Sequence, residues 1–402
     1  SPGDVYPGPY TNTRFWFRDA AFIIHALLCA GLSDRAERAL DRFPAKQTAA
    51  GYFHSQEGEW DANGETLWIM QRYCELTKRA PKRGWKRAIL RGARWIGRKR
   101  LSRQRQCPHA GLLPAGFSAE HLGPSDYYYW DSYWGVAGLR AAAALCESLG
   151  EGVASREFLD EAEAFLGDID RSLAGVATRL SRPAIPASPY RRLDAGAIGS
   201  LVVGYPLQLC SADDPRLLDT AAFLLDNCFV AGGFFQDMIH AGINPYLTLH
   251  IAQVLLRVGD SRYLELLDTV AELASPTGQW PEAIHPRTGG GCMGDGQHVW
   301  AAAEWILMLR HLFLREEAGA LVLCQGIPSR WLVAGAKLRF GPAPTAFGLL
   351  TLDVLPLEKH IEVSWEARWH HEPPRIEVRL PGLDPVRVSE GVASVEVPRG
   401  HS

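Results

Sequence analysis

The chain of 402 residues is 47% hydrophobic and 22% charged, values that are ordinary for a globular protein. Its formal net charge of −3 gives no general attraction to nucleic acid or to an anionic membrane surface, so neither is expected as a partner. The sequence has no run of roughly 18 apolar residues, so we expect no membrane-spanning helix. No signal-peptide pattern is visible, so we expect a cytoplasmic protein, although a first residue of Ser rather than Met leaves a processed N-terminus open.

Ala/Leu-rich segments with helical periodicity alternate with loops rich in Gly, Pro, aromatic and acidic residues over most of the chain. The links inside a pair of helices are short, whereas the segments that lead into each pair are long and aromatic. Six such hairpins predict a mainly α fold, the (α/α)6 barrel or six-hairpin toroid, over residues 1–317. The expected helices are 18–31, 33–43, 62–78, 83–101, 131–149, 155–180, 193–204, 215–228, 243–258, 260–273 and 297–315.

Each long loop carries a carboxylate. Because antiparallel hairpins bring all six long loops to one mouth, these carboxylates are expected around a common cavity. They are Asp19, Asp61, Asp131, Asp194, Asp237 and Glu282.

The sequence pattern changes near residue 318, where strand-like runs are separated by Gly/Pro turns. The runs ALVLCQGI, WLVAGAKLRFG, AFGLLTLDVL, HIEVSWEARWH and RIEVRL predict a small C-terminal β-sandwich over residues 318–402. We see no binding motif in it and expect it to pack against the barrel.

One basic segment breaks the charge balance, with thirteen Lys/Arg and no acid between Lys78 and Arg105. The exposed face of an outer helix is the favoured interpretation, and a docking site for an anionic polymer or a partner protein stays open. Residues at 3–4 spacing form one stripe: Arg83, Arg87, Arg91, Arg94 and Arg98.

No cofactor or metal is expected. The eight cysteines form no Cys-x-x-Cys pair and are expected to be reduced, buried thiols, and no His/Asp/Glu cluster has metal spacing. The Gly-rich run near residue 290 lacks the features of a phosphate-binding loop.

Two stretches early in the chain combine charge with tryptophan. In RFWFRDAAF, Trp16, Arg18 and Asp19 precede an apolar helix, and either a helix cap with its ion pair or a fork for sugar hydroxyls fits them. In EWDANGETLW, Trp60 and Asp61 open a helix on which Glu65 follows; the helix cap is again the simpler alternative to a cavity wall. The candidate sugar contacts here are Trp16, Arg18, Asp19, Trp60, Asp61 and Glu65.

The densest aromatic run is DYYYWDSYWG, residues 126–135. Asp131 lies between Trp130 and the pair Tyr133–Trp134, and apolar rings raise the pKa of a carboxyl group by penalising its ionised form. Asp126 lies outside the rings and is expected to be a turn or cap residue.

Later in the chain, QWPEAIHP places Glu282 after Trp280 in what we expect to be a loop with no regular element beside it, a polar setting in which this carboxylate stays ionised. The stretch HAGINPYLTLH adds His240, Asn244 and Tyr246 as candidate sugar contacts.

Three of these motifs, W-x-R-D, an acid directly after an aromatic-Trp pair, and PE-x-(I/V)-x-P-x-TG, resemble in this order those of the glucoamylase-like (α/α)6 glycoside hydrolases. The likeness covers the barrel, about three quarters of the chain. It implies that Arg18 and Asp19 hold the sugar in the −1 subsite, that Asp131 is the general acid and that Glu282 is the general base. Asp-Ser after the tryptophan departs from the Glu-Glu of glucoamylases and is closer to trehalases and processing α-glucosidases.

Glycoside hydrolysis with inversion requires the same two groups, since it needs one protonated acid and one ionised base about 6.5–9.5 Å apart. We therefore expect an inverting glycoside hydrolase that acts on an α-linked glucoside or similar sugar, with an oligosaccharide or glycoside as its partner. The alternatives are a polysaccharide lyase, for which the tyrosines at 127–129 would supply the base, and a catalytically inactive glycan-binding or scaffold barrel.

Overall fold

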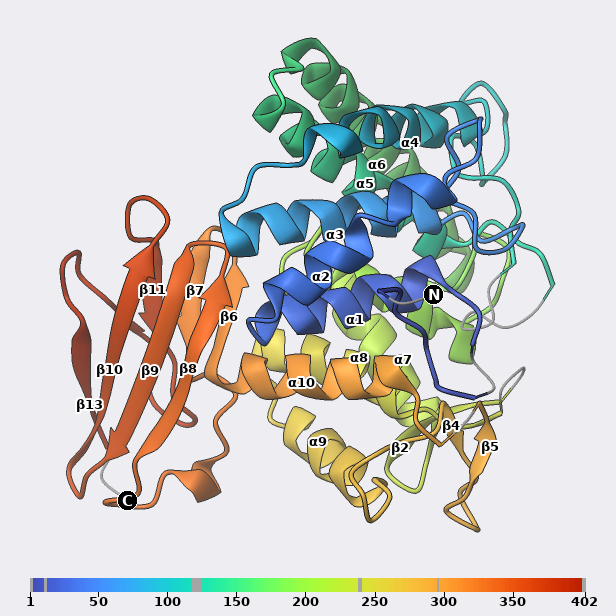
Figure 1. Ribbon diagram of the computed structural model, residues 1–402. Coiled ribbons are helices and arrows are strands. Elements are labelled where there is room, and N and C mark those ends of the chain that lie inside the picture. The colour runs from blue at the N-terminus through green and yellow to red at the C-terminus, as the bar shows by residue number, and fades with distance from the viewer. Residues whose placement is uncertain (1–2, 11–12, 118–123, 238–240, 295, 400–402) are drawn as a thin grey trace. The chain divides into compact units, whose positions relative to one another are not determined.

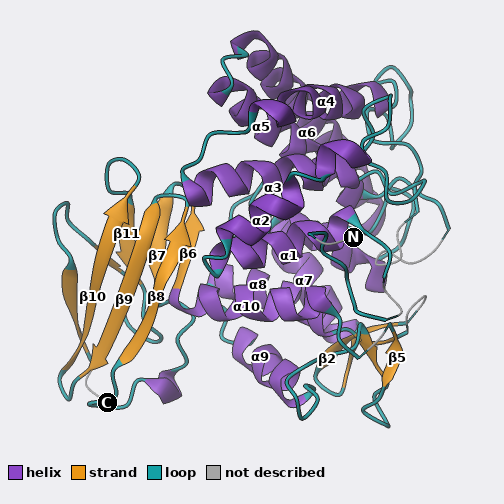
Figure 2. Ribbon diagram, in the orientation of Figure 1, coloured by secondary structure: helices purple, strands orange, loops and turns teal. Residues whose placement is uncertain are grey.

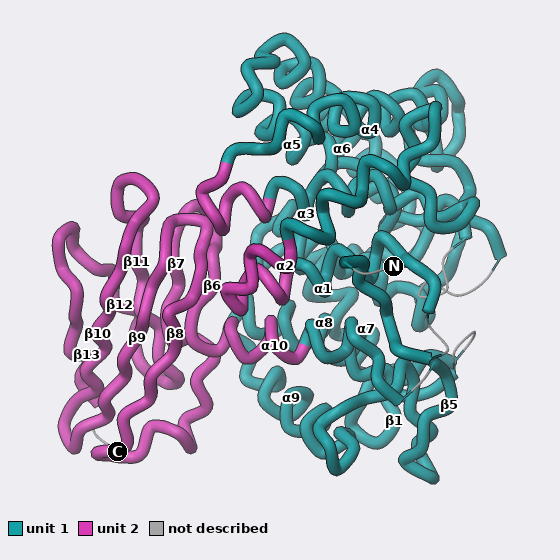
Figure 3. Tube along the Cα trace, in the orientation of Figure 1, with its two compact units in different colours: residues 1–24, 37–71, 80–304 teal, residues 25–36, 72–79, 305–402 magenta. Residues whose placement is uncertain are grey.

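The computed structural model describes residues 3–10, 13–117, 124–237, 241–294 and 296–399. The chain divides into two compact units (Figure 3). Unit 1 comprises Ser1–Ile24, Glu37–Gln71 and Ala80–Glu304, and unit 2 comprises His25–Ala36, Arg72–Arg79 and Trp305–Ser402.

The fold is mainly helical, as predicted, and ten α-helices occur in the described residues (Figure 1). They begin and end within a few residues of the expected segments, except that Ala195–Val203 forms a 3₁₀-helix, η3, in place of an α-helix. Its sequence AGAIGSLVV combines glycines with β-branched residues, which are poor α-helix formers. The α-helices are α1 Phe17–Cys29, α2 Ser33–Leu40, α3 Ala62–Thr77, α4 Lys86–Lys99, α5 Tyr129–Ser148, α6 Gly152–Leu180, α7 Pro215–Asn227, α8 Pro245–Val258, α9 Tyr263–Glu272 and α10 Val299–Phe313.

Helices with two kinds of burial alternate along the chain. α1, α5 and α8 are buried on nearly all sides, and every residue of α8 from Pro245 to Arg257 is buried. α2, α4, α6, α7 and α9 bury one face only. On α4 the buried face includes Ile89 and Ile96, and the basic stripe is largely on the other side, with Arg87 and Arg94 exposed. This alternation is what an inner layer and an outer layer of helices require.

Two glycines bring α3 and α5 into backbone contact. A Cβ atom on Gly64 would lie 2.1 Å from the carbonyl oxygen of Trp134, and one on Gly138 would lie 2.5 Å from the Cα atom of Gly64. Only a residue without a side chain fits such an approach. The contact holds the first turn of α3 against the first turns of α5, where Asp131 lies.

We expect Gly64→Ala to lower the free energy of unfolding by about 1–3 kcal/mol, because the added methyl group meets a backbone oxygen that cannot rotate away. Urea unfolding would measure the change. The matched control is Gly167→Ala on α6, where nothing lies within 4 Å of the added Cβ, and it should raise stability by up to about 1 kcal/mol. Equal stabilities for Gly64→Ala and wild type would contradict the close approach.

Unit 1 also contains a small antiparallel sheet that the sequence did not indicate. Its order is β1-β2-β3-β4-β5. Strands of two to four residues with glycines are too short to show the period of two by which strands are recognised. The strands are β1 Phe229–Val230, β2 Gly233–Gln236, β3 Gly242–Ile243, β4 Ala283–Ile284 and β5 Gly291–Met293.

Unit 2 contains two four-stranded sheets (Figure 2). One has the order β13-β10-β9-β8 and is antiparallel; the other has the order β12-β11-β7-β6, in which β7 and β11 run parallel. Residues from both sheets share one apolar core, among them Leu321, Leu352 and Val363. All five expected strand runs contain a strand. The strands are β6 Leu314–Glu317, β7 Ala320–Leu323, β8 Leu338–Thr345, β9 Gly348–Pro356, β10 His360–Trp369, β11 Arg375–Val378, β12 Val386–Arg387 and β13 Ser394–Pro398.

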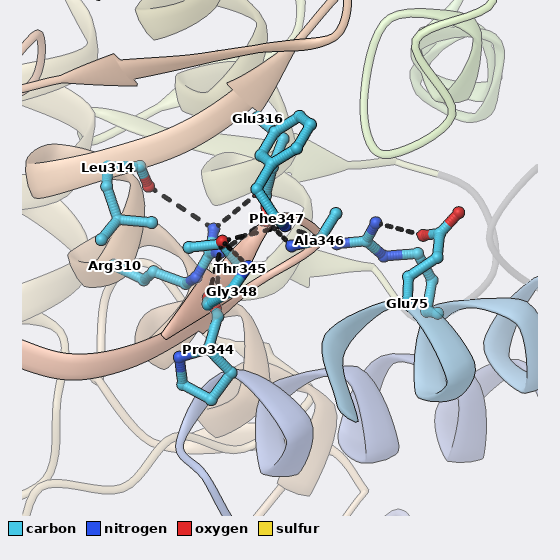
Figure 4. A network of polar contacts seen from close by, with 10 residues as sticks. Glu75, Arg310, Leu314, Glu316, Pro344, Thr345, Ala346, Phe347 and Gly348 are labelled. Carbon is cyan, nitrogen blue, oxygen red and sulfur yellow. Dashed lines mark hydrogen bonds and ion pairs between the residues drawn. The ribbon is translucent and has the colours of Figure 1, made fainter. Parts of the chain in front are cut away.

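A buried polar network fixes the passage from α10 to these sheets (Figure 4). Arg310 donates to both carboxylate oxygens of Glu316, at 2.9 and 3.1 Å, and to the carbonyl oxygen of Pro344 at 3.0 Å. Glu316 also accepts from the backbone N–H of Ala346. Burial alone would raise the pKa of Glu316, but the guanidinium groups of Arg310 and Arg72 hold it well below its usual range. The network therefore contains an ionised carboxylate.

No described helix has the length and apolar character needed to cross a membrane. The eight cysteines form no disulfide bond, in agreement with the sequence. The expected burial holds for three of them only: four of the others are half-buried, and Cys292, on the short edge strand β5, is exposed. The buried three are Cys29, Cys146 and Cys324, and the half-buried four are Cys74, Cys107, Cys210 and Cys228.

Candidate active site

Asp61 is the centre of a buried cluster between α1, α3 and α5. Arg18 donates to its Oδ2 atom through Nε at 2.8 Å and through Nη2 at 2.6 Å. Trp130 donates to the same oxygen at 2.7 Å. Arg18 is thus paired with Asp61, a partner that the helix-cap alternative did not include. The sequence predicted Arg18, Asp61 and Trp130 as site residues without predicting that they bind one another.

Two further carboxyl groups approach the Arg18 guanidinium. Glu59 Oε1 lies 3.8 Å from Nη1, and Glu65 Oε1 lies 3.9 Å from Nε. Neither Glu65 oxygen has a hydrogen-bond partner among the described residues. Burial, followed by the charge of Asp61, raises the pKa of Glu65 well above its usual value, while Arg18 opposes the shift. Glu65 therefore gives up its proton less readily than an exposed glutamate does.

Asp131 lies in the first turn of α5 and is completely buried. Neither of its carboxyl oxygens is hydrogen-bonded within the described part of the chain. Burial and then the negative charge of Asp61 raise its pKa well above the usual value; Arg18 lowers it and Glu59 raises it further. The sequence predicted the aromatic surroundings, and the structure adds neighbouring carboxylates as a second cause. A carboxyl group in this setting keeps its proton near neutral pH and can donate it.

Removing the charge of Glu59 should lower the pKa of Asp131, because a like charge disfavours ionisation. If Asp131 is the general acid, activity falls when it ionises at high pH. Glu59→Gln is therefore expected to shift the alkaline limb of the profile of kcat against pH to lower pH. Glu57→Gln, a change at an exposed position two residues away, should leave the limb in place. A limb unmoved by Glu59→Gln, or moved upward, would exclude this coupling.

A second group of side chains surrounds Asp19, which is 9% exposed. Nε2 of His298 lies 3.7 Å from Oδ1 of Asp19. The His298 ring packs 5.0 Å from Tyr246, and Tyr246 lies 4.6 Å from Trp300. Asp19 and Tyr246, both predicted sugar contacts, are thus linked through a histidine that the sequence did not indicate.

Glu282 directly precedes β4 and is 8% exposed, so the expectation of a loose loop with no regular element beside it was wrong. Ile284 of β4 pairs with Ile243 of β3, next to Asn244 at the start of α8. The carbonyl oxygen of Trp280 accepts the backbone N–H of His298 at 2.8 Å. The segment of Glu282 is therefore held between the segments of Asn244 and His298.

The remaining predicted aromatic residues belong mainly to the interior of unit 1. Trp134 packs on Phe22 and Trp68, and its indole is completely buried. Lys99 covers the ring of Trp60 at 3.6 Å. Trp60, Tyr133, Trp134 and Trp280 are all at most 5% exposed, whereas Trp16 is half-buried and His240 lies outside the described residues.

Sequence reasoning missed Glu59, His298 and the buried pair Glu304–His250. Glu304 accepts from the hydroxyl of Tyr205 at 3.0 Å, and its Oε1 atom lies 3.2 Å from Nε2 of His250. The segment EGEWDANGE is rich in acidic residues, and this was a signal for Glu59. The sequence gave no such signal for His298, because it is a single histidine before a helix.

The described residues contain no group of three side chains suited to hold a metal ion. Asp194, one of the six loop carboxylates, pairs with Arg191 at 2.7 Å. Asp194 in turn accepts from the backbone of Gly196 and caps η3.

Several solved glycosidases have a similar fold. A bacterial glucoamylase in complex with acarbose matches with a TM-score of 0.54 at 15% identity over 73% of this chain and 48% of its own. The glucoamylase of Saccharomycopsis fibuligera matches with a TM-score of 0.58 at 13% identity over 77% of this chain and 88% of its own. A glycosidase variant matches with a TM-score of 0.56 at 16% identity over 78% of this chain and 92% of its own.

This chain spans about half the length of that bacterial glucoamylase. No protein-family model and no curated protein sequence matches it. The structural likeness agrees with the resemblance in the motifs, and the chain has the fold of the glucoamylase-like glycosidases.

Proposed function

We propose that this protein is an inverting glycoside hydrolase that cleaves an α-linked glucoside or a similar sugar. The observation that carries the proposal is Asp131, a completely buried carboxyl group with a raised pKa and no hydrogen-bond partner among the described residues. A buried acid left without a partner costs stability. Such a cost is tolerated where a substrate atom, here the glycosidic oxygen, becomes the partner.

Glu282 acts as the general base in this proposal and deprotonates the attacking water. Its segment is fixed by β4 and by the contact of Trp280 with His298, so the base is held in place before the substrate arrives. Inversion requires about 6.5–9.5 Å between the two carboxyl groups to leave room for that water. Arg18 and Asp19 hold the sugar beside the scissile bond, with Asp61, Tyr246 and Asn244 around it.

The architecture belongs to the same proposal. Helices that are buried on nearly all sides alternate with helices that bury one face only. This alternation supports an (α/α)6 barrel in residues 1–317, with the 3₁₀-helix η3 in the place of one inner helix. The two sheets that share one apolar core support a β-sandwich in residues 318–402. The pairing of β3 with β4 supports a position of Glu282 near the start of α8.

The proposal is tested with a panel of aryl glycosides and oligosaccharides, assayed with wild type beside Asp131→Asn and Glu282→Gln. We expect release of a reducing sugar by wild type and its loss in both variants. Activity that survives both substitutions would remove these residues from the mechanism. An inactive wild type that still binds glycans would support the alternative of a glycan-binding barrel.

A further inference from the structure

Unit 2 contains a cavity of about 370 Å³, and two tryptophans of β10 contribute to its lining. Its volume falls in the range of roughly 300–1,000 Å³ that is typical of small-molecule sites. All the residues that line it belong to unit 2, and none of the candidate active-site residues is among them. We call it the β10 cavity.

One wall of the β10 cavity is the C-terminal half of β10, which lies between β13 and β9 in its sheet (Figure 1). Trp365, Ala367 and Trp369 share the face of this strand that is turned to the apolar core, because side chains alternate along a strand. β10 has ten residues, whereas β11 and β12 of the facing sheet have four and two. The pairing of β10 with β13 ends at Ser364. The end of β10 therefore extends past the strands that would cover it.

The loop from β12 to β13 forms another wall as it crosses from one sheet to the other. It is tied to both sheets by backbone hydrogen bonds. The N–H of Val388 donates to the carbonyl oxygen of Ile376 at 3.0 Å, and the N–H of Trp365 donates to that of Ala393 at 2.9 Å. Residues 389–392 between these bonds are exposed, so the β10 cavity is open to solvent on this side. The loop is thus held in place before any ligand binds.

The polar groups of the β10 cavity favour a neutral ligand. Its lining includes one guanidinium group, that of Arg375, one carboxylate, that of Glu390, and the hydroxyl of Ser389. A ligand with a net charge would meet a group of its own sign, whereas a neutral ligand meets balanced charges. A purely apolar ligand would cover these polar groups without hydrogen-bonding them, which is costly. The ligand should therefore be uncharged and carry hydrogen-bonding groups of its own.

The two tryptophans add a preference for a ring with an apolar face. Trp365 and Trp369 are four residues apart on one strand, a separation of about 13 Å between their Cα atoms. Ala367 lies between them, and its small side chain leaves space that a larger one would fill. Flat indole faces suit the C–H face of a sugar ring, whose hydroxyl groups can bond the polar groups of the lining. The sequence showed no binding motif here, because both tryptophans fit the alternation of an ordinary strand.

We propose that the β10 cavity is a non-catalytic carbohydrate site, which binds a sugar unit of an α-linked glucan between Trp365 and Trp369. The choice of a sugar among neutral ring ligands rests on the proposed function. A polymer bound there stays attached to the protein between cleavage events, which raises the effective concentration of its glycosidic bonds at the active site.

The test is electrophoresis through gels that contain soluble starch, in which a protein that binds starch migrates more slowly. All proteins carry Asp131→Asn, so that starch is not consumed and the contribution of the active site is the same in each. Trp369→Ala removes one ring and should raise the dissociation constant for starch roughly 3- to 10-fold. Equal retardation with and without Trp369→Ala, or no retardation of either protein, would overturn the proposal.

The matched control is Trp331→Ala. Trp331 is a half-buried tryptophan of the same unit that does not line the β10 cavity, so its loss should leave the retardation unchanged. A loss as large as that of Trp369→Ala would show that the effect is not specific to the cavity. Thermal melting of each variant identifies any loss that comes from unfolding.

A second variant, Ala367→Leu, tests the space and keeps both rings. The larger side chain fills the hollow between the two indoles, so starch binding should weaken as it does in Trp369→Ala. Unchanged retardation of Ala367→Leu would exclude the β10 cavity as the binding site, even if Trp369→Ala binds starch less tightly.

Hydrolysis of p-nitrophenyl α-glucoside by wild type separates this inference from the proposed function. A wild type that hydrolyses nothing, but whose starch binding depends on Trp369 and Ala367, would defeat the proposed function and leave the carbohydrate site standing. An active wild type whose starch binding is unchanged by both substitutions would do the reverse.

Discussion

Asp131→Asn is expected to lower kcat on a natural oligosaccharide by roughly 100- to 10,000-fold, because the amide cannot protonate the leaving oxygen. A p-nitrophenolate leaving group needs little protonation, so the loss on an aryl glycoside should be smaller. Steady-state kinetics on both substrates measure the difference. Losses of equal size on the two would show that Asp131 does not act as the acid.

The same substitution should stabilise the folded protein at neutral pH. Below about pH 4, the usual pKa of an aspartate, the carboxyl group is protonated in the folded and the unfolded chain alike. Above this value the unfolded chain ionises while the raised pKa keeps Asp131 protonated in the folded chain, so stability falls as pH rises toward the folded-state pKa. Asparagine carries no such penalty. The melting temperature of Asp131→Asn should exceed that of wild type at pH 7, and the two should converge toward pH 4.

Glu282→Gln is expected to reduce kcat to a similar extent, roughly 100- to 10,000-fold, since a glutamine cannot take a proton from water. This loss should be as large on the aryl glycoside as on the oligosaccharide, because the attack by water is needed whatever group leaves. The two variants thus distinguish acid from base by their dependence on the leaving group.

The matched control for this change is Glu272→Gln, at an exposed position near the end of α9, which should leave kcat unchanged. Full activity of Glu282→Gln would transfer the role of base to another group. The buried Glu304 beside His250 would then be the first to examine.

The helical part of the fold could be predicted because its signal is repeated along the chain. α8 and α5 are apolar over many residues, and α4 shows one-sided periodicity, so their positions follow from the sequence. The strands β9 and β10 are long and alternate in burial, and they were predicted for a similar reason. The pairs β3–β4 and β4–β5 could not be foreseen, since their strands are only two or three residues long and β3 is far from β4 in sequence.

The types of residue in the candidate site could be predicted, but their pairing could not. The sequence places Arg18 beside Asp19, yet the backbone of α1 directs the guanidinium to Asp61, 43 residues further on. The raised pKa of Asp131 was expected from its aromatic neighbours in sequence, whereas the contribution of Asp61 and Glu59 depends on the contact between α3 and α5 at Gly64. Contacts of this kind are set by helix packing, which a local pattern does not specify.

The most direct test of the central claim, hydrolysis by an acid and a base on opposite sides of the sugar, is the anomeric form of the first product. Proton NMR spectra taken within the first minutes of hydrolysis of an α-glucoside distinguish the two anomers before they equilibrate. The Asp131–Glu282 pair predicts β-glucose as the initial product. Initial release of α-glucose would contradict it, as would an unsaturated sugar, the product of a lyase.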